Sequence, residues 1–189
     1  MNALAGRHGR AAGNLAPHLL AALDHYLEVL LGVQVAVKSN ETPARRTLLA
    51  AFDLVGAVIT ADAMHTQTGT ATYIRSRGGH RVLTVKSNQP GLFRRCKSLP
   101  WVQIRSTSTL DTGHGRRVRR SIKVAAEPQL RDFPHVVQVA QNRRTHTTRR
   151  GKKTVEVVYI ITSMPSTEAS PWQIATWVQG HWGIENKLH

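Results

Sequence analysis

The chain of 189 residues is long enough for one domain with a buried core, and its 41% content of hydrophobic residues argues against a disordered chain. Lys and Arg total 26 against 11 Asp and Glu, so the net charge of +15 indicates a polyanionic partner, with nucleic acid the leading candidate. A generic solvated basic surface is the alternative. No run is long enough to span a membrane and the lone Cys96 cannot form an internal disulfide, so we expect a cytoplasmic protein without a membrane partner.

The first third of the chain reads as an irregular start followed by short elements. Residues 1–17 are rich in Gly, Ala and Arg with no sustained period, which predicts an irregular N-terminal segment. Apolar runs at 18–23 and 29–37, joined by a short polar link, predict an antiparallel hairpin. A helix is expected to begin at Thr42-Pro43, and residues 57–60 form a short apolar strand.

The rest of the chain changes from mixed elements to long strands. A helix at 70–77 is ended by Gly78-Gly79, a strand follows at 81–85, and a second short helix ends near residues 99–100. From 101 to 163 the pattern is rich in strands, and the alternating segments are 117–125, 136–141 and 154–162. The capping-box spacing of Ser170 and Gln173, with Pro171 at the first turn, predicts a helix from there to the end.

Two acids stand out in this basic chain. Asp62 ends the apolar run 57–61, and Glu185 shares the apolar stripe of the last helix, which also holds Ile174, Trp177, Val178, His181 and Leu188. An unpaired carboxylate on a buried face is costly, so Glu185 is expected to be neutralised, paired with a cation or bound to a metal. A surface glutamate paired with Lys187 or an arginine is the alternative. Two remote carboxylates in one cationic protein suggest a shared divalent metal.

Five segments in order carry a resemblance to a known family. They are HLLAALDH at 18–25, KSNETP at 38–43, VITADAMHTQ at 58–67, LTVKSNQP at 83–90 and GHWGIENKLH at 180–189. Together they resemble the DDE transposases of bacterial insertion sequences, in the subgroup that includes the H-repeat-associated proteins. The resemblance implies an α/β, ribonuclease-H-like fold: a mixed sheet flanked by helices, with a β-rich insertion at about 101–163 before the last helix.

The resemblance also implies a catalytic site and a substrate. The family gathers two Asp and one Glu around Mg²⁺ or Mn²⁺; Asp62 matches the second acid and Glu185 the third. Two such ions would activate the attacking oxygen and stabilise the leaving oxygen at phosphorus, and Mg²⁺ prefers carboxylate and phosphate oxygens. The implied activity is DNA transposition: cleavage at a transposon end and strand transfer into target DNA. A homodimer in the DNA complex and association with the nucleoid are further expectations.

One family element is missing. The first acid belongs to an Asp-Gly-Lys motif on the opening strand, yet no residue before Asp24 is acidic. We therefore expect a copy truncated at both ends, in which 1–17 is a remnant, 18–189 is the catalytic domain, and DNA affinity persists with weak or no catalysis. Two alternatives remain open: a basic nucleic-acid-binding domain without chemistry, and a nuclease of the same fold that hydrolyses without joining.

Several polar residues are candidates for DNA contact, and each also has a simpler structural explanation. His65 could contact DNA near Asp62 or simply lie in a turn; His181, one turn before Glu185, could contact phosphate or pack. Lys86 and Asn88 follow a strand and could touch the DNA backbone or be solvated. The segment from 143 to 153 predicts a cationic tip suited to phosphate contact without sequence reading. Its basic residues are Arg143, Arg144, Arg149, Arg150, Lys152 and Lys153.

Overall fold

A computed structural model describes residues 2–7, 18–24, 30–35, 49–61, 63, 66–113, 116–126, 130 and 133–187. For 2–7, 18–24, 30–35, 116 and 181–187 it describes the backbone alone. The chain divides into two compact units, one made of Met1–Leu83 with Trp177–His189 and the other of Thr84–Thr176. The secondary structure confirms the α/β class that the sequence predicted.

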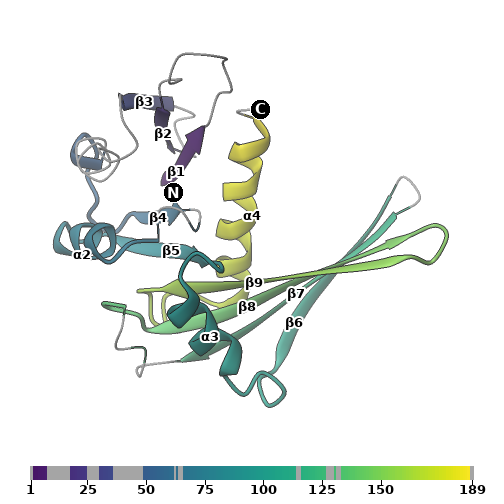
Figure 1. The fold of residues 1–189 in the computed structure, drawn as a ribbon. Helices are drawn as coiled ribbons and strands as arrows, with labels where there is room; N and C mark the ends of the chain where they lie inside the picture. The colour runs from purple at the N-terminus through teal and green to yellow at the C-terminus, as the bar shows by residue number, and fades with distance from the viewer. Residues whose placement is uncertain are drawn as a thin grey trace. The chain divides into compact units, whose positions relative to one another are not determined.

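The first unit is built on a mixed sheet. Its strands are β1 (Asn2–Arg7), β2 (His18–Asp24), β3 (Leu30–Val35), β4 (Val58–Ala61) and β5 (His80–Val85), in the order β3-β2-β1-β4-β5 (Figure 1). β2 pairs antiparallel with both β1 and β3, whereas β4 pairs parallel with β1 and β5. The predicted hairpin of the two early apolar runs is confirmed by the β2–β3 pairing.

Part of the predicted irregular start is a strand, so that prediction was wrong for residues 2–7. Strand β1 lies between β2 and β4, with Ala3 opposite Leu23 on one side and Thr60 on the other. Its sequence NALAGR has neither the branched residues nor the alternation that mark a strand. Pairing on both sides supplies the backbone hydrogen bonds that local propensity does not. Residues 8–17 and most of the helix predicted from Thr42-Pro43 lie outside the described residues.

The helix α2 (Thr68–Ser76) follows β4 and precedes β5 along the chain, and all three elements were predicted. Ile59, Thr60 and Ala61 of β4 are buried, as are all residues of β5 except His80. Gly78 follows α2 with a φ of 76°, the left-handed conformation that favours glycine after a helix. At Gly79 a Cβ would approach Ile74 Cγ2 and the Leu54 carbonyl oxygen to 3.0 Å, so this close approach also needs glycine.

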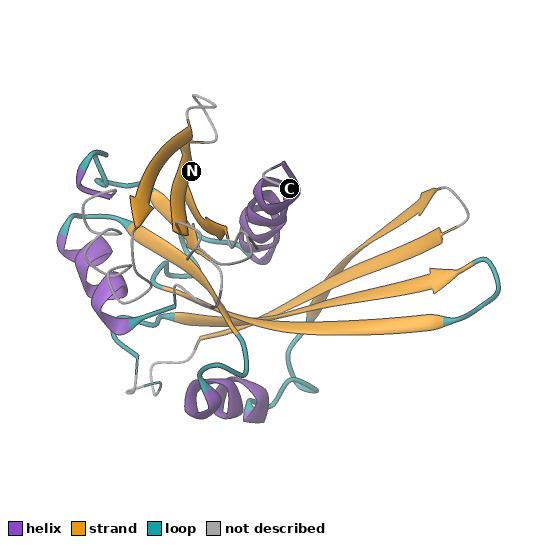
Figure 2. Ribbon diagram, turned by 45° about the horizontal axis from the view of Figure 1, so that its top comes forward, coloured by secondary structure: helices purple, strands orange, loops and turns teal. Residues whose placement is uncertain are grey.

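The second unit is an antiparallel sheet with one helix against it. Its elements are α3 (Pro90–Ser98), β6 (Ser106–Gly113), β7 (Arg116–Ala126), β8 (Gln138–Thr148) and β9 (Lys153–Thr162), with the strand order β9-β8-β7-β6. Figure 2 shows these long strands side by side, with α3 near one end of the sheet. The strand predicted at 136–141 continues to Thr148. The predicted strand-rich segment therefore contains two long hairpins.

The core of this second unit lies where α3 meets β9. Phe93 of α3 packs edge-on against Tyr159 of β9, with ring centroids 5.4 Å apart, and Trp101 packs against the same ring at 6.0 Å. Trp101 donates its Nε1 hydrogen to the Cys96 carbonyl oxygen at 2.9 Å. Cys96 is a fully buried free thiol, which fits a small packing residue.

The last helix, α4 (Pro171–Lys187), begins with the capping box that the sequence predicted. The Gln173 backbone nitrogen donates to Ser170 Oγ at 3.3 Å, and the Ser170 backbone nitrogen donates to Gln173 Oε1 at 2.9 Å. In the first half of the predicted apolar stripe, Ile174 and Val178 are buried and Trp177 is half-buried. In the part of the chain that the structure describes, no helix is both long and apolar enough to cross a membrane.

Candidate functional site

The first predicted acid follows β4, a buried interior strand of the mixed sheet. β4 has a parallel neighbour on each side, with Leu4 and Leu83 both opposite Ala61. Asp62 is the next residue, and it lies outside the described residues, as does His65. Ala63 and Thr66 beyond it are 3% and 1% exposed, and the Thr66 nitrogen donates to the Ala63 carbonyl oxygen. The chain on either side of Asp62 is therefore buried.

The second predicted acid lies on a helix whose start is well defined. The backbone of Glu185 and His181 belongs to α4, while their side chains lie outside the description. Among the described residues no group of three or more His, Cys, Asp or Glu side chains could hold a metal, and the side chains of Asp62 and Glu185 are not among those described. The convergence of Asp62 and Glu185 stays a prediction.

A buried cation on β5, the strand that pairs with β4, was not predicted. Arg81 on β5 lies opposite Ile59 of β4 and is fully buried. Its Nη1 donates to the Ala71 carbonyl oxygen of α2 at 3.4 Å. Burial, together with the nearby charge of Arg75, lowers the pKa of Arg81 to about 10, so the side chain stays protonated at neutral pH. In the sequence this residue opens an apolar run, and nothing local distinguishes it from an exposed strand-end arginine.

Lys86 and Asn88 are exposed, as solvated or DNA-contacting residues must be. They follow β5 in the turn that leads into α3, where the Gln89 nitrogen donates to the Lys86 carbonyl oxygen at 3.1 Å. The structure thus places both at a strand end, where the sequence predicted them, and their role stays a prediction.

The predicted cationic tip is shorter than the sequence suggested. Arg143 and Arg144 lie within β8, so only residues 149–152 form the turn between β8 and β9. Arg149, Arg150 and Lys152 are exposed in that turn, and Gly151 has a φ of 79°. Arg143 and Arg144 lie on opposite faces of the sheet, since neighbouring strand residues alternate. The tip was overextended because residues 143–148 of β8 are polar on both faces and give no apolar alternation.

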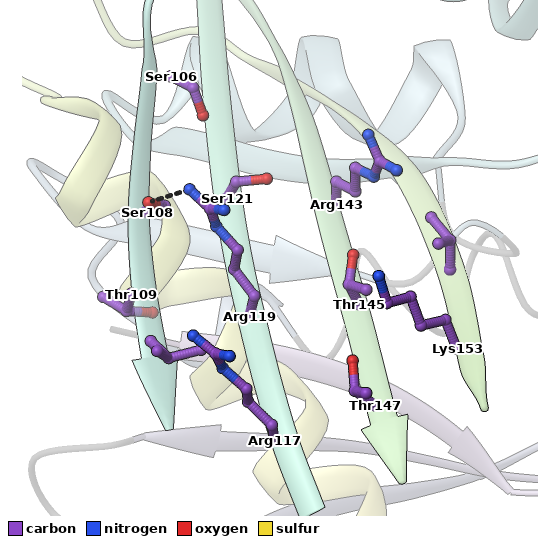
Figure 3. Close-up of a pocket in the computed structure, with 12 residues that line it drawn as sticks. Ser106, Ser108, Thr109, Arg117, Arg119, Ser121, Arg143, Thr145, Thr147 and Lys153 are labelled. Carbon is purple, nitrogen blue, oxygen red and sulfur yellow. Dashed lines mark hydrogen bonds between the residues drawn. The ribbon is translucent and has the colours of Figure 1, made fainter. Parts of the chain in front are cut away.

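One face of the β6–β9 sheet gathers the cations of several strands around a hollow of about 730 Å³ (Figure 3). We call this the basic face; its cations are Arg117, Arg119, Arg143 and Lys153, all exposed. The hydroxyl groups that line it come from Ser106, Ser108, Thr109, Ser121, Thr145 and Thr147. Arg119 donates from Nη2 to Ser108 Oγ at 3.4 Å. Of the four cations, only Arg143 and Lys153 were predicted as DNA contacts.

The pairing register explains why these side chains share one face. Arg117 pairs with Thr147, which pairs with Lys153, and Ser121 pairs with Arg143. Directly paired residues point to the same side of an antiparallel sheet. The sequence predicted a strand that contains Arg117 and Arg119. Only the pairing register shows that both share a face with Arg143.

The chain belongs to the transposase DDE domain family, whose model matches residues 6–189. Two Escherichia coli K12 proteins, YbfL and YhhI, are each 30% identical over 187 residues, covering 91% of this chain and 49% of theirs. YhhI is named as an H repeat-associated transposase. YncI of Escherichia coli O157:H7 is 30% identical over 183 residues, covering 91% of this chain and 47% of its own. The predicted family is confirmed.

The chain thus spans about half the length of the curated relatives it matches. Among solved structures, DesVI of Streptomyces venezuelae is 13% identical with a TM-score of 0.29, covering 70% of this chain and 59% of that chain. A similarity at that level carries no information on function.

Proposed function

We propose that this chain acts in DNA transposition, as a catalytic domain that cleaves DNA and transfers a strand to target DNA. DNA is the substrate that the transposase family implies, and the family generally uses divalent metal ions. The observation that carries the proposal is the family match over residues 6–189, within which Asp62 directly follows the buried strand β4. Residues 18–189 would form this domain, with the strand-rich segment as an insertion before α4.

The mixed sheet supports a ribonuclease-H-like arrangement of the site. β4 runs parallel to β1 and β5, and ligands of open sheets with parallel strands bind beyond the carboxyl ends of those strands. Asp62 follows β4 in the sequence, so it would lie at that edge. Glu185 would come from α4, whose beginning is fixed by the Ser170–Gln173 capping box. The two acids are remote in sequence, and a fold of this kind would bring them together.

The donor chemistry fits Mg²⁺ or Mn²⁺. Asp62 and Glu185 would supply carboxylate oxygens, the ligands that these hard ions prefer. The bound metal would activate the attacking oxygen and stabilise the leaving oxygen at phosphorus. His65, Lys86, Asn88 and His181 would contact the DNA backbone, which positions the substrate without reading its sequence. Two copies of the chain would act together on DNA.

The proposal is tested with the two acids replaced one at a time. In Asp62→Asn and Glu185→Gln the side chains keep their shape but lose their charge, so Mn²⁺ binding, followed by titration calorimetry, should fall by about tenfold or more. Mg²⁺-dependent nicking of a duplex with a transposon end should fall in parallel. If both variants bind Mn²⁺ and nick DNA like the wild type, the assignment of these acids is wrong.

Matched controls separate the site from a general loss of negative charge. Asp53→Asn changes an exposed aspartate whose Oδ1 accepts from the Val55 nitrogen at 3.1 Å, a role that an amide oxygen keeps. Glu168→Gln changes an exposed glutamate before α4. Both controls should leave Mn²⁺ affinity and nicking within about twofold of the wild type.

DNA binding without catalysis is the second candidate, and the composition favours it. The excess of 26 Lys and Arg over 11 Asp and Glu suits a polyanionic partner without requiring any chemistry. In that case the chain would bind DNA equally well with and without Mg²⁺, and neither acid would affect the binding. Nicking by the wild type would exclude this candidate.

A further inference from the structure

We propose that the basic face binds the sugar-phosphate backbone of duplex DNA without reading the bases. This inference rests on the proposed function, which supplies DNA as the ligand. It assigns the contact to Arg117, Arg119, Arg143 and Lys153, and to the hydroxyl groups between them, in place of the whole cationic segment predicted from the sequence.

The charges of the β6–β9 sheet are distributed unequally between its two faces. On the opposite face Asp111 forms an ion pair with Arg120, and Glu156 is the register partner of Arg144. The basic face has neither acid, because Asp111 and Glu156 both point to the other side by strand alternation. Among the described residues no ion pair neutralises Arg117, Arg143 or Lys153. The four cations of the basic face therefore have no acid on their own face of the described strands, whereas Arg120 and Arg144 of the opposite face each have one beside them.

The spacing of the polar groups suits a regular row of phosphates. Arg117 and Arg119 are two residues apart on β7, which places their Cα atoms about 7 Å apart along the strand. Consecutive phosphates of one DNA strand advance about 3.4 Å along the helix axis and also rotate about it, so two cations spaced in this way can reach two different phosphates of one strand. Ser121, Thr145 and Thr147 add hydroxyl donors between the cations, a type of group that often contacts phosphate. Figure 3 shows these cations and hydroxyls side by side on the strands.

The width of the face argues against reading bases in a groove. Four strands separated by about 4.8 Å place the outer strands about 14 Å apart, whereas the major groove is about 12 Å wide and accepts a two-stranded ribbon. The sheet would therefore lie across the backbone. None of the described residues that line the hollow is Phe, Tyr or Trp, so it offers no platform on which single-stranded bases could stack.

The test measures binding of the whole chain to a labelled duplex by fluorescence anisotropy, in EDTA and over a range of salt concentrations. EDTA separates binding from metal-dependent chemistry. Arg119→Ala/Arg143→Ala should reduce the slope of log affinity against log salt by about two and weaken binding by about tenfold or more. The loss should be equal for two duplexes of unrelated sequence, because backbone contacts carry no sequence information.

The control pair is Arg94→Ala/Lys97→Ala, which removes the same charge from the exposed surface of α3. Its salt slope should stay close to that of the wild type. Arg119→Lys/Arg143→Lys keeps the charge and should restore most of the slope. If the alanine pair does not fold, Lys153→Gln at the exposed start of β9 gives the same test with a slope change of about one.

Four results would overturn or redirect the inference. An equal loss in the α3 control would mean that only net charge matters, and an unchanged slope in the basic-face variants would mean that this face does not meet DNA. A loss seen with one duplex but not with the other would mean that the face reads bases. If the wild type binds no duplex at all, the proposed function fails together with the inference.

Discussion

Arg81 shows how one residue can connect the elements around the first acid. Its guanidinium is buried beneath β5 and donates to Ala71 of α2, the helix that follows the Asp62 segment. A charged group in such a place lowers stability unless its hydrogen bonds compensate for lost hydration. Because Ala71 belongs to the helix after Asp62, we expect Arg81 to hold that helix against the sheet.

Replacing Arg81 with alanine should reduce the free energy of unfolding by about 2–4 kcal/mol, because the change leaves a cavity and removes the hydrogen bond to the Ala71 carbonyl oxygen. Urea unfolding followed by circular dichroism measures the loss. The loss should be the same at pH 6 and pH 8, since a pKa of about 10 keeps Arg81 charged across that range. Because folding lowers the pKa of Arg81, burying its charge costs its full free energy below about pH 10. Above that pH the folded protein loses the proton and the cost becomes smaller.

Arg77→Ala is the matched control for this change, because Arg77 is an exposed arginine at the end of α2. It should alter stability by less than about 0.5 kcal/mol. An Arg81→Ala protein as stable as this control would show that Arg81 does not secure α2.

At the residue scale, the sequence located single side chains better than it located groups of them. Lys86 and Asn88 lie exposed after a strand, as their positions after an apolar run predicted. Arg143 and Arg144 were placed together in a tip, yet they lie on opposite faces of β8. Adjacent residues in a strand point to opposite sides, so a cluster in sequence is not a cluster in space.

At the element scale, the elements with local signals were predicted and those defined by pairing were not. The capping box at Ser170 and the Gly78-Gly79 pair mark helix ends through contacts within a few residues. β1 and the outer half of β8 have weak local signals. They form strands because partners far away in sequence complete their hydrogen bonds, with β1 paired on both sides.

Ser170→Ala should lower the free energy of unfolding by about 1 kcal/mol, because it removes the side-chain acceptor for the Gln173 nitrogen at the start of α4. Urea unfolding followed by tryptophan fluorescence would detect it, since Trp172 and Trp177 lie in this helix. Ser166→Ala, in the exposed turn before α4, should change stability by less than half as much. Equal effects of the two changes would mean that the cap does not stabilise α4.

At the scale of the whole molecule, charge and family membership lead to the same ligand. The net charge of +15 comes from 26 basic residues, and four of them gather on one face of the second unit without an acid beside them. The family match supplies the chemistry that charge alone cannot identify. The sequence could suggest both acids, but their distance depends on tertiary structure that local patterns do not specify.

The central claim is that Asp62 and Glu185 share a divalent cation. Fe²⁺ bound in place of Mg²⁺ generates hydroxyl radicals with ascorbate and peroxide, and these cut the polypeptide beside the ion. We predict cuts near both residue 62 and residue 185, and in Asp62→Asn the cut near 185 should disappear together with the cut near 62. Cuts near only one of the two positions, a cut near 185 that survives Asp62→Asn, or no cut at either position would contradict the claim.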